Sequence, residues 1–203
     1  MRKPLACTLL AALSIWLLCF MANELGHVYG DNKTELRNPN AKPAIVARFS
    51  PRGGITDADV VAIDAAKTEI LIQAYSFTSK PICAALIAAK QRGVDVQLLI
   101  DAGAATARSC KAYDLAQTKC LVRIAACGGL AHNKIMLIDS QTVLTGSFNW
   151  SAQAENLNQE NQLIITGYPE LMKSYRDNWQ KCWDAGTPYV PTKIKTKKPK
   201  KIE

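Results

Sequence analysis

The sequence predicts an α/β fold whose sheet is largely parallel in its N-terminal half. Three observations lead to this fold class. Short apolar, β-like runs alternate with helical segments through the first half of the chain. Apolar residues make up 48% of the chain, which is enough for a core of this size. The length of 203 residues fits one domain with additional terminal segments.

The first half contains five elements in regular alternation. Pro81 is acceptable in the first turn of a helix, and Gly93 ends that helix before an apolar strand. In chain order we expect a strand at Ile45–Phe49, a helix from a cap at Thr56 or Asp57 through Lys67, a strand at Glu69–Ser76, a helix at Pro81–Arg92 and a strand at Val94–Ile100.

The second half mixes helices with a hairpin, and no internal repeat is visible. The tripeptide Asp139–Gln141 between two β-like runs is a hairpin signal. Trp179 and Trp183 lie on an amphipathic closing helix, where core packing is their expected role. The expected elements are a helix at Ala105–Thr118, strands at Leu121–Ala125, Asn133–Asp139, Thr142–Thr145 and Gln162–Thr166, and a helix at Pro169–Asp184.

The N-terminus is typical of an export signal. Arg2 and Lys3 precede an apolar run from Leu5 to Met21, which predicts a secretory signal peptide within residues 1–30. Cleavage after Ala22 or after Gly30 is compatible with the sequence. The run of 17 residues is slightly shorter than the roughly 20 of a membrane span, so an uncleaved anchor is the alternative. We therefore expect an exported protein, periplasmic or secreted, or one anchored to a membrane.

The remaining chain divides into a linker, a domain and a basic tail. Polar residues 31–43 form the linker, residues 44–186 the domain, and residues 187–203 the lysine-rich tail. Loss of Arg2, Lys3 and Glu24 with the leader lowers the formal net charge from +8 to +7. Thr192–Glu203 alone holds six lysines and one glutamate. Such a charge favours anionic partners, either nucleic acid or lipid head groups, although the tail itself is expected to be solvated.

The cysteines and histidines argue against a structural zinc site. There is no C-x-x-C pair, and the chain has only two histidines, His27 and His132. Export permits disulfides, and an odd number of cysteines leaves at least one free or paired between chains. Cys110 and Cys127 are possible disulfide partners, with free buried thiols as the alternative. The cysteines beyond the leader are Cys83, Cys110, Cys120, Cys127 and Cys182.

One segment carries chemistry at fixed spacing. It begins at His132 and ends at Asn149 with the pattern H-x-K-x4-D-x6-G-S-x-N. Residues two apart on a strand project from the same face, so His132 and Lys134 point to one spot. Ser147 and Asn149 follow the next strand, also two apart. The combined imidazole, ammonium, hydroxyl and amide suit a phosphate diester, whose oxygens Lys134, Ser147 and Asn149 would bind.

This pattern is identified as the catalytic signature of the phospholipase D superfamily. The chain resembles its compact bacterial members, exported nucleases and small phospholipases D, from about Ala44 to Ala185. The resemblance rests on Glu69–Asp101, Thr145–Trp150 and Trp179–Trp183 in addition to the motif. It implies an α/β/α sandwich around a mixed β-sheet. It also implies that no cofactor and no metal are needed, because the lysine and a second histidine take over a metal's roles.

The resemblance further assigns roles to individual residues. His132 is implied as the nucleophile that forms a phosphohistidine, and a second histidine as the acid that protonates the leaving oxygen. Because the chain has one motif and His27 leaves with the leader, the second histidine is expected from a partner, in a homodimer with a shared active site. Glu160 is implied to bind the other ring nitrogen of His132, with a surface turn residue as the alternative. Asp139 is expected to organise the site by hydrogen bonds, or to be a turn residue.

Three functions remain open at this point. A nuclease acting on DNA or RNA is favoured by the positive charge and the lysine tail. A phospholipase D that converts phosphatidylcholine or another phospholipid to phosphatidic acid fits a retained membrane anchor. A non-catalytic polyanion-binding module is the third, and the intact motif argues against it. The stretches Ala102–Lys111 and Ala125–Ala131 depart from the family pattern and leave the substrate preference open.

Overall fold

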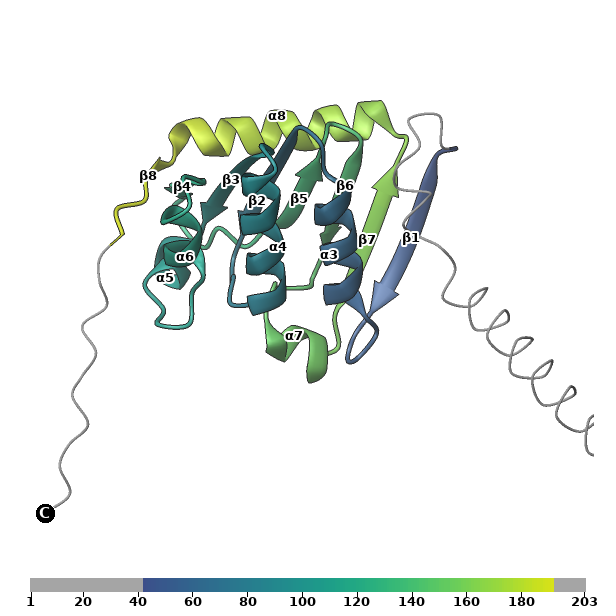
Figure 1. The fold of residues 1–203 in the computed structure, drawn as a ribbon, viewed down its shortest axis with the longest axis horizontal. Helices are drawn as coiled ribbons and strands as arrows, with labels where there is room; N and C mark the ends of the chain where they lie inside the picture. Colours follow the sequence, from purple (N-terminus) through teal and green to yellow (C-terminus); the bar gives the residue numbers. More distant parts are fainter. Residues whose placement is uncertain (1–41, 192–203) are drawn as a thin grey trace, which may run out of the picture. The chain divides into compact units, whose positions relative to one another are not determined.

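The computed structural model describes residues 42–191, which form an eight-stranded mixed sheet (Figure 1). Strands β2, β3 and β4 run parallel to one another, whereas all other neighbours are antiparallel. The strand order is β1-β7-β6-β5-β2-β3-β4-β8. The strands are β1 (Ala44–Phe49), β2 (Glu69–Ala74), β3 (Asp95–Ile100), β4 (Leu121–Ile124), β5 (Lys134–Ile138), β6 (Thr142–Gly146), β7 (Asn161–Thr166) and β8 (Thr187–Pro188).

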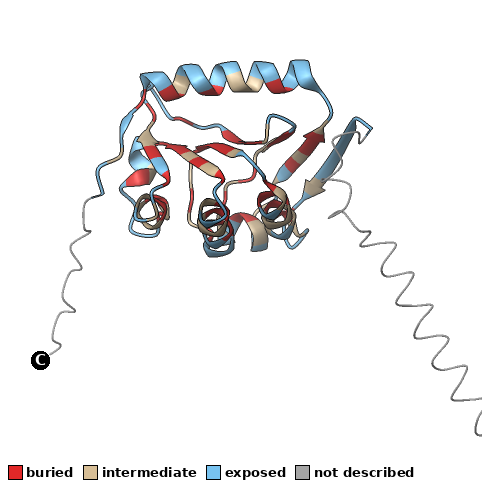
Figure 2. Cartoon of the chain, turned by 45° about the horizontal axis from the view of Figure 1, so that its top comes forward, coloured by how far each residue is buried: buried red, intermediate tan, exposed pale blue. Residues whose placement is uncertain are grey.

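Helices cover both faces of this sheet. The long helix α8 lies across one face, and α3, α4 and α6 lie on the other, so that three layers are visible in Figure 2. The α/β/α sandwich around a mixed sheet is therefore confirmed. The helices are α3 (Ile55–Ala65), α4 (Lys80–Gln91), α5 (Ala102–Ala105), α6 (Ala112–Ala116), α7 (Ala152–Asn156) and α8 (Pro169–Ala185).

The core beneath α8 confirms the role expected for the two tryptophans. Trp179 is 1% exposed, stacks on Trp183 at 4.9 Å between ring centroids, and donates its indole N–H to the carbonyl of Ile72 at 3.1 Å. The same cluster contains Leu71 and Leu137 from the central strands β2 and β5. The indole hydrogen bond also satisfies the polar end of a buried aromatic ring.

The hairpin between β5 and β6 is confirmed, and the residues of its turn suit the backbone conformation found there. Asp139 and Ser140 have positive φ values of 53° and 55°. The N–H of Gln141 donates to the carbonyl of Ile138 at 3.0 Å, so Asp139 and Ser140 are the two central residues of the turn. A turn with both central residues left-handed matches the twist of the flanking strands, and aspartate tolerates this conformation better than most residues. Ile138 and Thr142 pair directly beside the turn.

The single helix expected at Ala105–Thr118 is wrong, because the chain forms two short helices there. Asp101 starts α5 early by accepting hydrogen bonds from the backbone N–H of Gly103 and Ala104. The chain then leaves the helical path, and the N–H of Lys111 donates to the carbonyl of Phe77 at 2.8 Å before α6 begins. A contact to a distant loop therefore breaks the helix.

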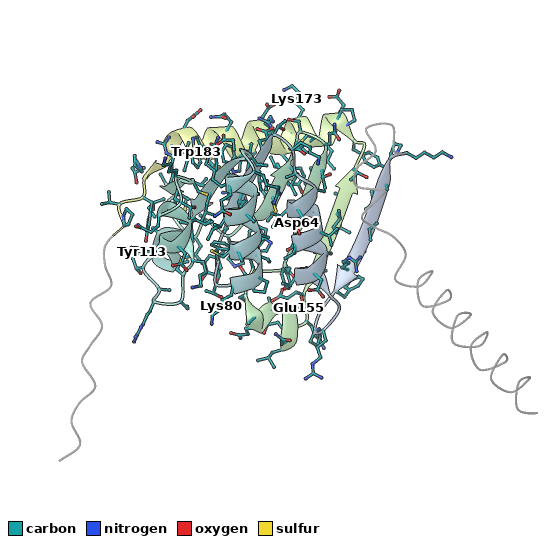
Figure 3. The ribbon with its side chains drawn as sticks, viewed as in Figure 1. Asp64, Lys80, Tyr113, Glu155, Lys173 and Trp183 are labelled. Carbon is teal, nitrogen blue, oxygen red and sulfur yellow. The ribbon has the colours of Figure 1, made fainter. Side chains whose placement is uncertain are left out.

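The cap expected at Thr56 or Asp57 is also wrong. Helix α3 begins at Ile55, and the carboxylate that binds its first turn is that of Glu155 in α7. Glu155 accepts from the backbone N–H of Gly54 at 3.0 Å and of Thr56 at 2.8 Å. Figure 3 shows Glu155 at this end of α3. The cap is thus supplied about 100 residues away in sequence.

The domain extends past residue 186, where the sequence analysis placed its end. Thr187 and Pro188 pair with β4, and the N–H of Tyr189 donates to the carbonyl of Val122 at 2.9 Å. The first residues assigned to the tail therefore close the edge of the sheet. This strand is only two residues long, which is too short for a sequence pattern to reveal it.

Several expectations concern residues outside the described range. The leader of residues 1–30, with His27, and the lysines from residue 192 onward lie there, as does nearly all of the linker. Among the described helices none is both long and apolar enough to cross a membrane. The five cysteines of residues 42–191 are all free thiols, with Cys110 buried and Cys127 exposed, so the disulfide considered between these two is not present.

Candidate active site

Three strands, β5, β6 and β7, bring the motif residues to one edge of the sheet. His132 lies just before β5, Ser147 and Asn149 follow β6, and Glu160 directly precedes β7. Because β5 and β6 are antiparallel, as are β6 and β7, the start of β5, the end of β6 and the start of β7 meet at the same edge. Helix α7, which connects β6 to β7, lies beyond this edge in Figure 1.

Lys134 is a buried cation at the centre of this edge. It is 6% exposed, and its Nζ donates to the backbone carbonyl of His132 at 2.5 Å. The ammonium also lies 4.9 Å from the ring centroid of Tyr75, within cation–π distance. Burial lowers the pKa of Lys134 below 10.5, and the nearby charge of Glu160 opposes this shift. Within residues 42–191 no carboxylate forms an ion pair with Lys134, so its other N–H groups can bind an anion.

His132 is exposed and oriented by its neighbours. Its ring packs against Tyr75 with 4.5 Å between centroids and an angle of 52° between planes. The preceding residue, Ala131, donates its backbone N–H to Asp101 at 3.0 Å. The Tyr75 ring therefore contacts the His132 ring and also lies within cation–π distance of the Lys134 ammonium.

Asp101 is a buried carboxylate that shapes the approach to His132. Burial alone would raise its pKa, but backbone hydrogen bonds from Ala104, Ala131 and Gly103, together with the nearby His132, outweigh burial and bring the pKa below 3.8. Asp101 thus stays ionised and ties the end of β3 to the segment that carries the histidine.

Glu160 binds Ser147 instead of His132 in this chain. Ser147 Oγ donates to Glu160 Oε2 at 2.6 Å, and Asn158 Nδ2 donates to Oε1 at 2.9 Å. The expected hydrogen bond from the imidazole to Glu160 is therefore absent from the described contacts. The reason is the register of β6 and β7, in which Gly146 pairs with Gln162 and brings Ser147 next to the glutamate.

Asn149 has an unsatisfied acceptor at the site. Its Oδ1 is buried and has no hydrogen-bond partner among the described residues. The following residue, Trp150, is 1% exposed, and its carbonyl accepts the N–H groups of Thr78 and Ser79, both at 2.8 Å. The loop is therefore held firmly while the amide of Asn149 keeps free capacity, which a bound ligand or water can use.

Asp139 is not part of this site, contrary to its place in the predicted set. It lies at the opposite end of β5, which is five residues or roughly 17 Å long. Its carboxylate accepts from the backbone N–H of Lys67, Thr68 and Glu69 and from the Thr68 hydroxyl, at 2.7 to 3.1 Å. Its hydrogen bonds organise the connection from α3 to β2 and not the candidate site.

The sequence reasoning missed Tyr75 and Asp101. Each directly follows a parallel strand, Tyr75 after β2 and Asp101 after β3. The carboxyl ends of such strands are where ligand sites of open α/β sheets form, which is the signal that could have found them. Their proximity to His132 depends on the antiparallel pairing of β2 with β5, in which Ala74 lies opposite Lys134.

Within residues 42–191 no cluster of His, Cys, Asp and Glu is arranged to hold a metal ion.

A family model described as the cardiolipin synthase, PLD-like domain matches residues 60–183, more than half of the chain. The chain belongs to the phospholipase D family. Within this fold, His132, Lys134, Ser147 and Asn149 lie at one edge of the sheet and Asp139 lies at the other end of β5.

Relatives within the phospholipase D family carry different names. Phospholipase D of Rickettsia prowazekii is 40% identical over 131 residues, which is 64% of this chain and 63% of that protein. Mitochondrial cardiolipin hydrolase of Xenopus laevis is 28% identical over 129 residues, 64% of this chain and 61% of that one. These matches span slightly less than two thirds of the relatives' length.

Solved structures of compact members share the fold. Nuc from Salmonella typhimurium, a phospholipase D family member, aligns with a TM-score of 0.71 at 38% identity, over 74% of this chain and all of the other. NucT from Helicobacter pylori aligns with a TM-score of 0.68 over 73% of this chain and all of the other. At 22% identity, the second match speaks for the fold alone.

Proposed function

We propose that this phospholipase D family protein hydrolyses phosphodiester bonds through a covalent intermediate on His132. The observation that carries the proposal is the buried Lys134 ammonium, held by the carbonyl of the exposed His132. A buried cation without a carboxylate partner is unfavourable in the free protein, and a bound phosphate relieves that cost.

The chemistry follows from the positions of four groups. A neutral ring nitrogen of His132 attacks phosphorus, forming a P–N bond while the P–O bond to the leaving alcohol breaks. Lys134 and the amide N–H of Asn149 bind the non-bridging oxygens as negative charge builds on them. Water then attacks phosphorus and passes a proton to the group that protonated the leaving alcohol, while the P–N bond breaks and the phosphate monoester leaves. Glu160 keeps Ser147 oriented through the 2.6 Å hydrogen bond.

A second acid is needed for the leaving alcohol, and it is proposed to come from a partner. His132 is the sole histidine of residues 42–191. In a homodimer with two-fold symmetry the same patch of both subunits meets, which places two His132 side chains across one phosphate. One imidazole must be neutral and the other protonated, so the rate should fall at both low and high pH.

Nucleic acid is the favoured substrate. Similarity to Nuc over the whole of that chain, the net charge of +8 and the lysine-rich tail support it. A phospholipase D activity is the second candidate, supported by the name of the Rickettsia relatives and by the apolar run from Leu5 to Met21. We also propose export, with or without a retained anchor, from that run and the two basic residues before it.

A substrate panel in EDTA separates these candidates. The purified protein is incubated with single- and double-stranded DNA, RNA, phosphatidylcholine and cardiolipin, with bis(p-nitrophenyl) phosphate as a minimal diester. We expect turnover of the minimal diester and of a nucleic acid. Turnover of lipid alone would select the phospholipase, and salt-dependent binding with no turnover would select a polyanion-binding module. Loss of all activity in EDTA with recovery in Mg²⁺ would overturn the metal-independent mechanism.

Mixed dimers test the shared site. Wild-type and His132→Ala chains with different affinity tags are combined, and the heterodimer is isolated. We expect less than about one tenth of the wild-type rate, because removal of either the nucleophile or the acid costs a factor of ten or more. Sedimentation should show a dimer. A fully active monomer, or a heterodimer at half the wild-type rate, would mean that each chain carries a complete site.

A further inference from the structure

A fully buried carboxyl group contacts two residues that flank Ser147 and Asn149. Asp59, on α3, is 0% exposed. Its Oδ2 accepts from the indole Nε1 of Trp150 at 3.0 Å and from Nε2 of Gln162 at 3.3 Å. Within residues 42–191 no cation forms an ion pair with it, whereas buried charges in proteins are normally paired.

Two oxygens of this cluster lack a donor. Asp59 Oδ1 and Gln162 Oε1 are both buried and have no hydrogen-bond partner in the described part of the chain. Both are acceptors if Asp59 is ionised, so neither can satisfy the other. In the protonated acid one oxygen of Asp59 carries a hydrogen-bond donor, which this set of acceptors otherwise lacks.

The charges around Asp59 are consistent with a protonated acid. Burial raises its pKa from 3.8 to about 8, and this effect outweighs the hydrogen bonds from Gln162 and Trp150, which lower it. Glu155, on α7, raises the pKa further, and Arg48, on β1, lowers it. At neutral pH the group is therefore largely uncharged.

Both partners of Asp59 hold the loop that carries Ser147 and Asn149. Gln162 lies opposite Gly146 in the register of β6 and β7, at the start of the loop. Trp150 directly follows Asn149, and its carbonyl is bound by the N–H groups of Thr78 and Ser79. The indole and the carbonyl of Trp150 are thus fixed from two sides, and Asp59 provides the hydrogen bond to the indole.

We propose that Asp59 is a positioning residue for the proposed hydrolysis, which in its neutral form binds Trp150 and Gln162 and thereby places Ser147 and Asn149 at the phosphate. The inference rests on the proposed function. Ionisation of Asp59 buries a charge and loosens the loop. The catalytic rate therefore falls at alkaline pH because Asp59 ionises, although Asp59 does not contact the reacting atoms.

Three variants test the proposal with bis(p-nitrophenyl) phosphate as substrate. Asp59→Asn keeps an acceptor for Trp150 and a donor for Gln162 without an ionisable group. Asp59→Leu removes both, and Asp57→Asn makes the same change at an exposed position of the same helix. At pH 6 we expect kcat of Asp59→Asn within about twofold of wild type and kcat of Asp59→Leu lower by about tenfold or more, from the misplaced loop. The ratio of Asp59→Asn to wild type should rise as the pH passes 8, and Asp57→Asn should follow wild type throughout.

A measurement without substrate separates this proposal from the proposed function. The carboxyl ¹³C resonance of Asp59 and the indole ¹⁵N–H resonance of Trp150 should titrate together near pH 8 in wild type, and the indole should not titrate in Asp59→Asn. A carboxyl titration near pH 4, wild-type kcat in folded Asp59→Leu, or a loss in Asp59→Asn as large as in Asp59→Leu would each overturn the positioning role. If no form cleaves any diester, the proposed function fails, while the resonances still decide the protonation of Asp59.

Discussion

The two ends of the β5–β6 hairpin both carry motif residues, but their polar groups are in opposite states. At the turn, the carboxylate of Asp139 accepts four hydrogen bonds from the connection between α3 and β2. At the other end, Lys134 is buried without a carboxylate partner in the described chain, and Asn149 Oδ1 has no donor. The carboxylate at the turn thus has its hydrogen-bond partners within the protein, whereas the polar groups at the other end keep unused hydrogen-bonding capacity.

This difference separates structure from function within a single motif. A saturated polar group stabilises the fold and has little left to offer a ligand. An unsaturated buried group costs free energy in the free protein and regains it when a ligand supplies the missing partner. The comparison therefore assigns folding to Asp139 and supports the proposed phosphate binding by Lys134, although both belong to one sequence pattern. The free Asn149 Oδ1 is an acceptor, so it can take a hydrogen bond from water or a ligand hydroxyl but not from a phosphate oxygen.

The largest effect is expected from His132→Ala. Loss of the proposed nucleophile should lower kcat by at least about 10³-fold, because the proposed mechanism has no other group to form the covalent intermediate. The side chain is exposed, so the free energy of unfolding should change little. Initial rates on a diester, together with urea unfolding, measure both. A folded variant that keeps near wild-type kcat would remove His132 from the site.

Lys134→Met should separate activity from stability most clearly. We expect kcat to fall by about 10²- to 10³-fold, as on removal of a group that stabilises transition-state charge. Methionine suits this position better than alanine, which would leave a cavity, because the side chain is buried. Stability should be unchanged or higher.

The pH dependence of unfolding checks the same substitution. Because the pKa of Lys134 is lowered in the folded state, the unfolded chain binds the proton more tightly. The wild-type free energy of unfolding should therefore gain from this group as the pH rises from its lowered pKa to 10.5. The gain should be missing in Lys134→Met. If the free energy of unfolding changed with pH in the same way in both proteins, the pKa of Lys134 would not be lowered by burial in the folded state.

Asp139→Ala should produce the reverse pattern. Removal of the carboxylate leaves backbone N–H groups of Lys67 and Glu69 unbound, which should lower the free energy of unfolding by about 1–3 kcal/mol. The kcat of the folded fraction should stay within about twofold of wild type, since roughly 17 Å of strand separates the turn from the site. Loss of kcat on the scale of Lys134→Met, at unchanged stability, would erase the distinction between the two ends.

Deletion of Thr192–Glu203 serves as a control for these substitutions, because the tail is not part of the β5–β6 hairpin. Saturated turnover should not change. If nucleic acid is the substrate, each lysine that contacts a phosphate contributes about 0.7 to 0.9 to the slope of log affinity against log salt, so the slope should become shallower. Binding of a labelled oligonucleotide between low and moderate salt measures this effect. An unchanged slope would show that the tail does not contact the polyanion.

The sequence by itself determined what depends on local geometry. The short spacing along the chain keeps His132 beside Lys134 at the start of β5, and Ser147 and Asn149 together at the end of β6. The strand period expected to align each pair does not apply, because His132, Ser147 and Asn149 lie outside the strands. The residues Asp139 and Ser140 predict the hairpin turn because both tolerate a positive φ there. Alternation of apolar strands with helices was sufficient for the α/β class.

The tertiary structure alone decided which distant residues meet. Asp139 binds residues about 70 positions away, Glu155 caps a helix about 100 positions away, and Asp59 reaches Trp150 across 91 positions. Tyr75 joins the site because β2 pairs with β5. The sequence alone does not show whether a carboxylate will bind backbone amides, an indole or a ligand. Its role is set by strand register and burial, which are properties of the whole sheet and not of any local pattern.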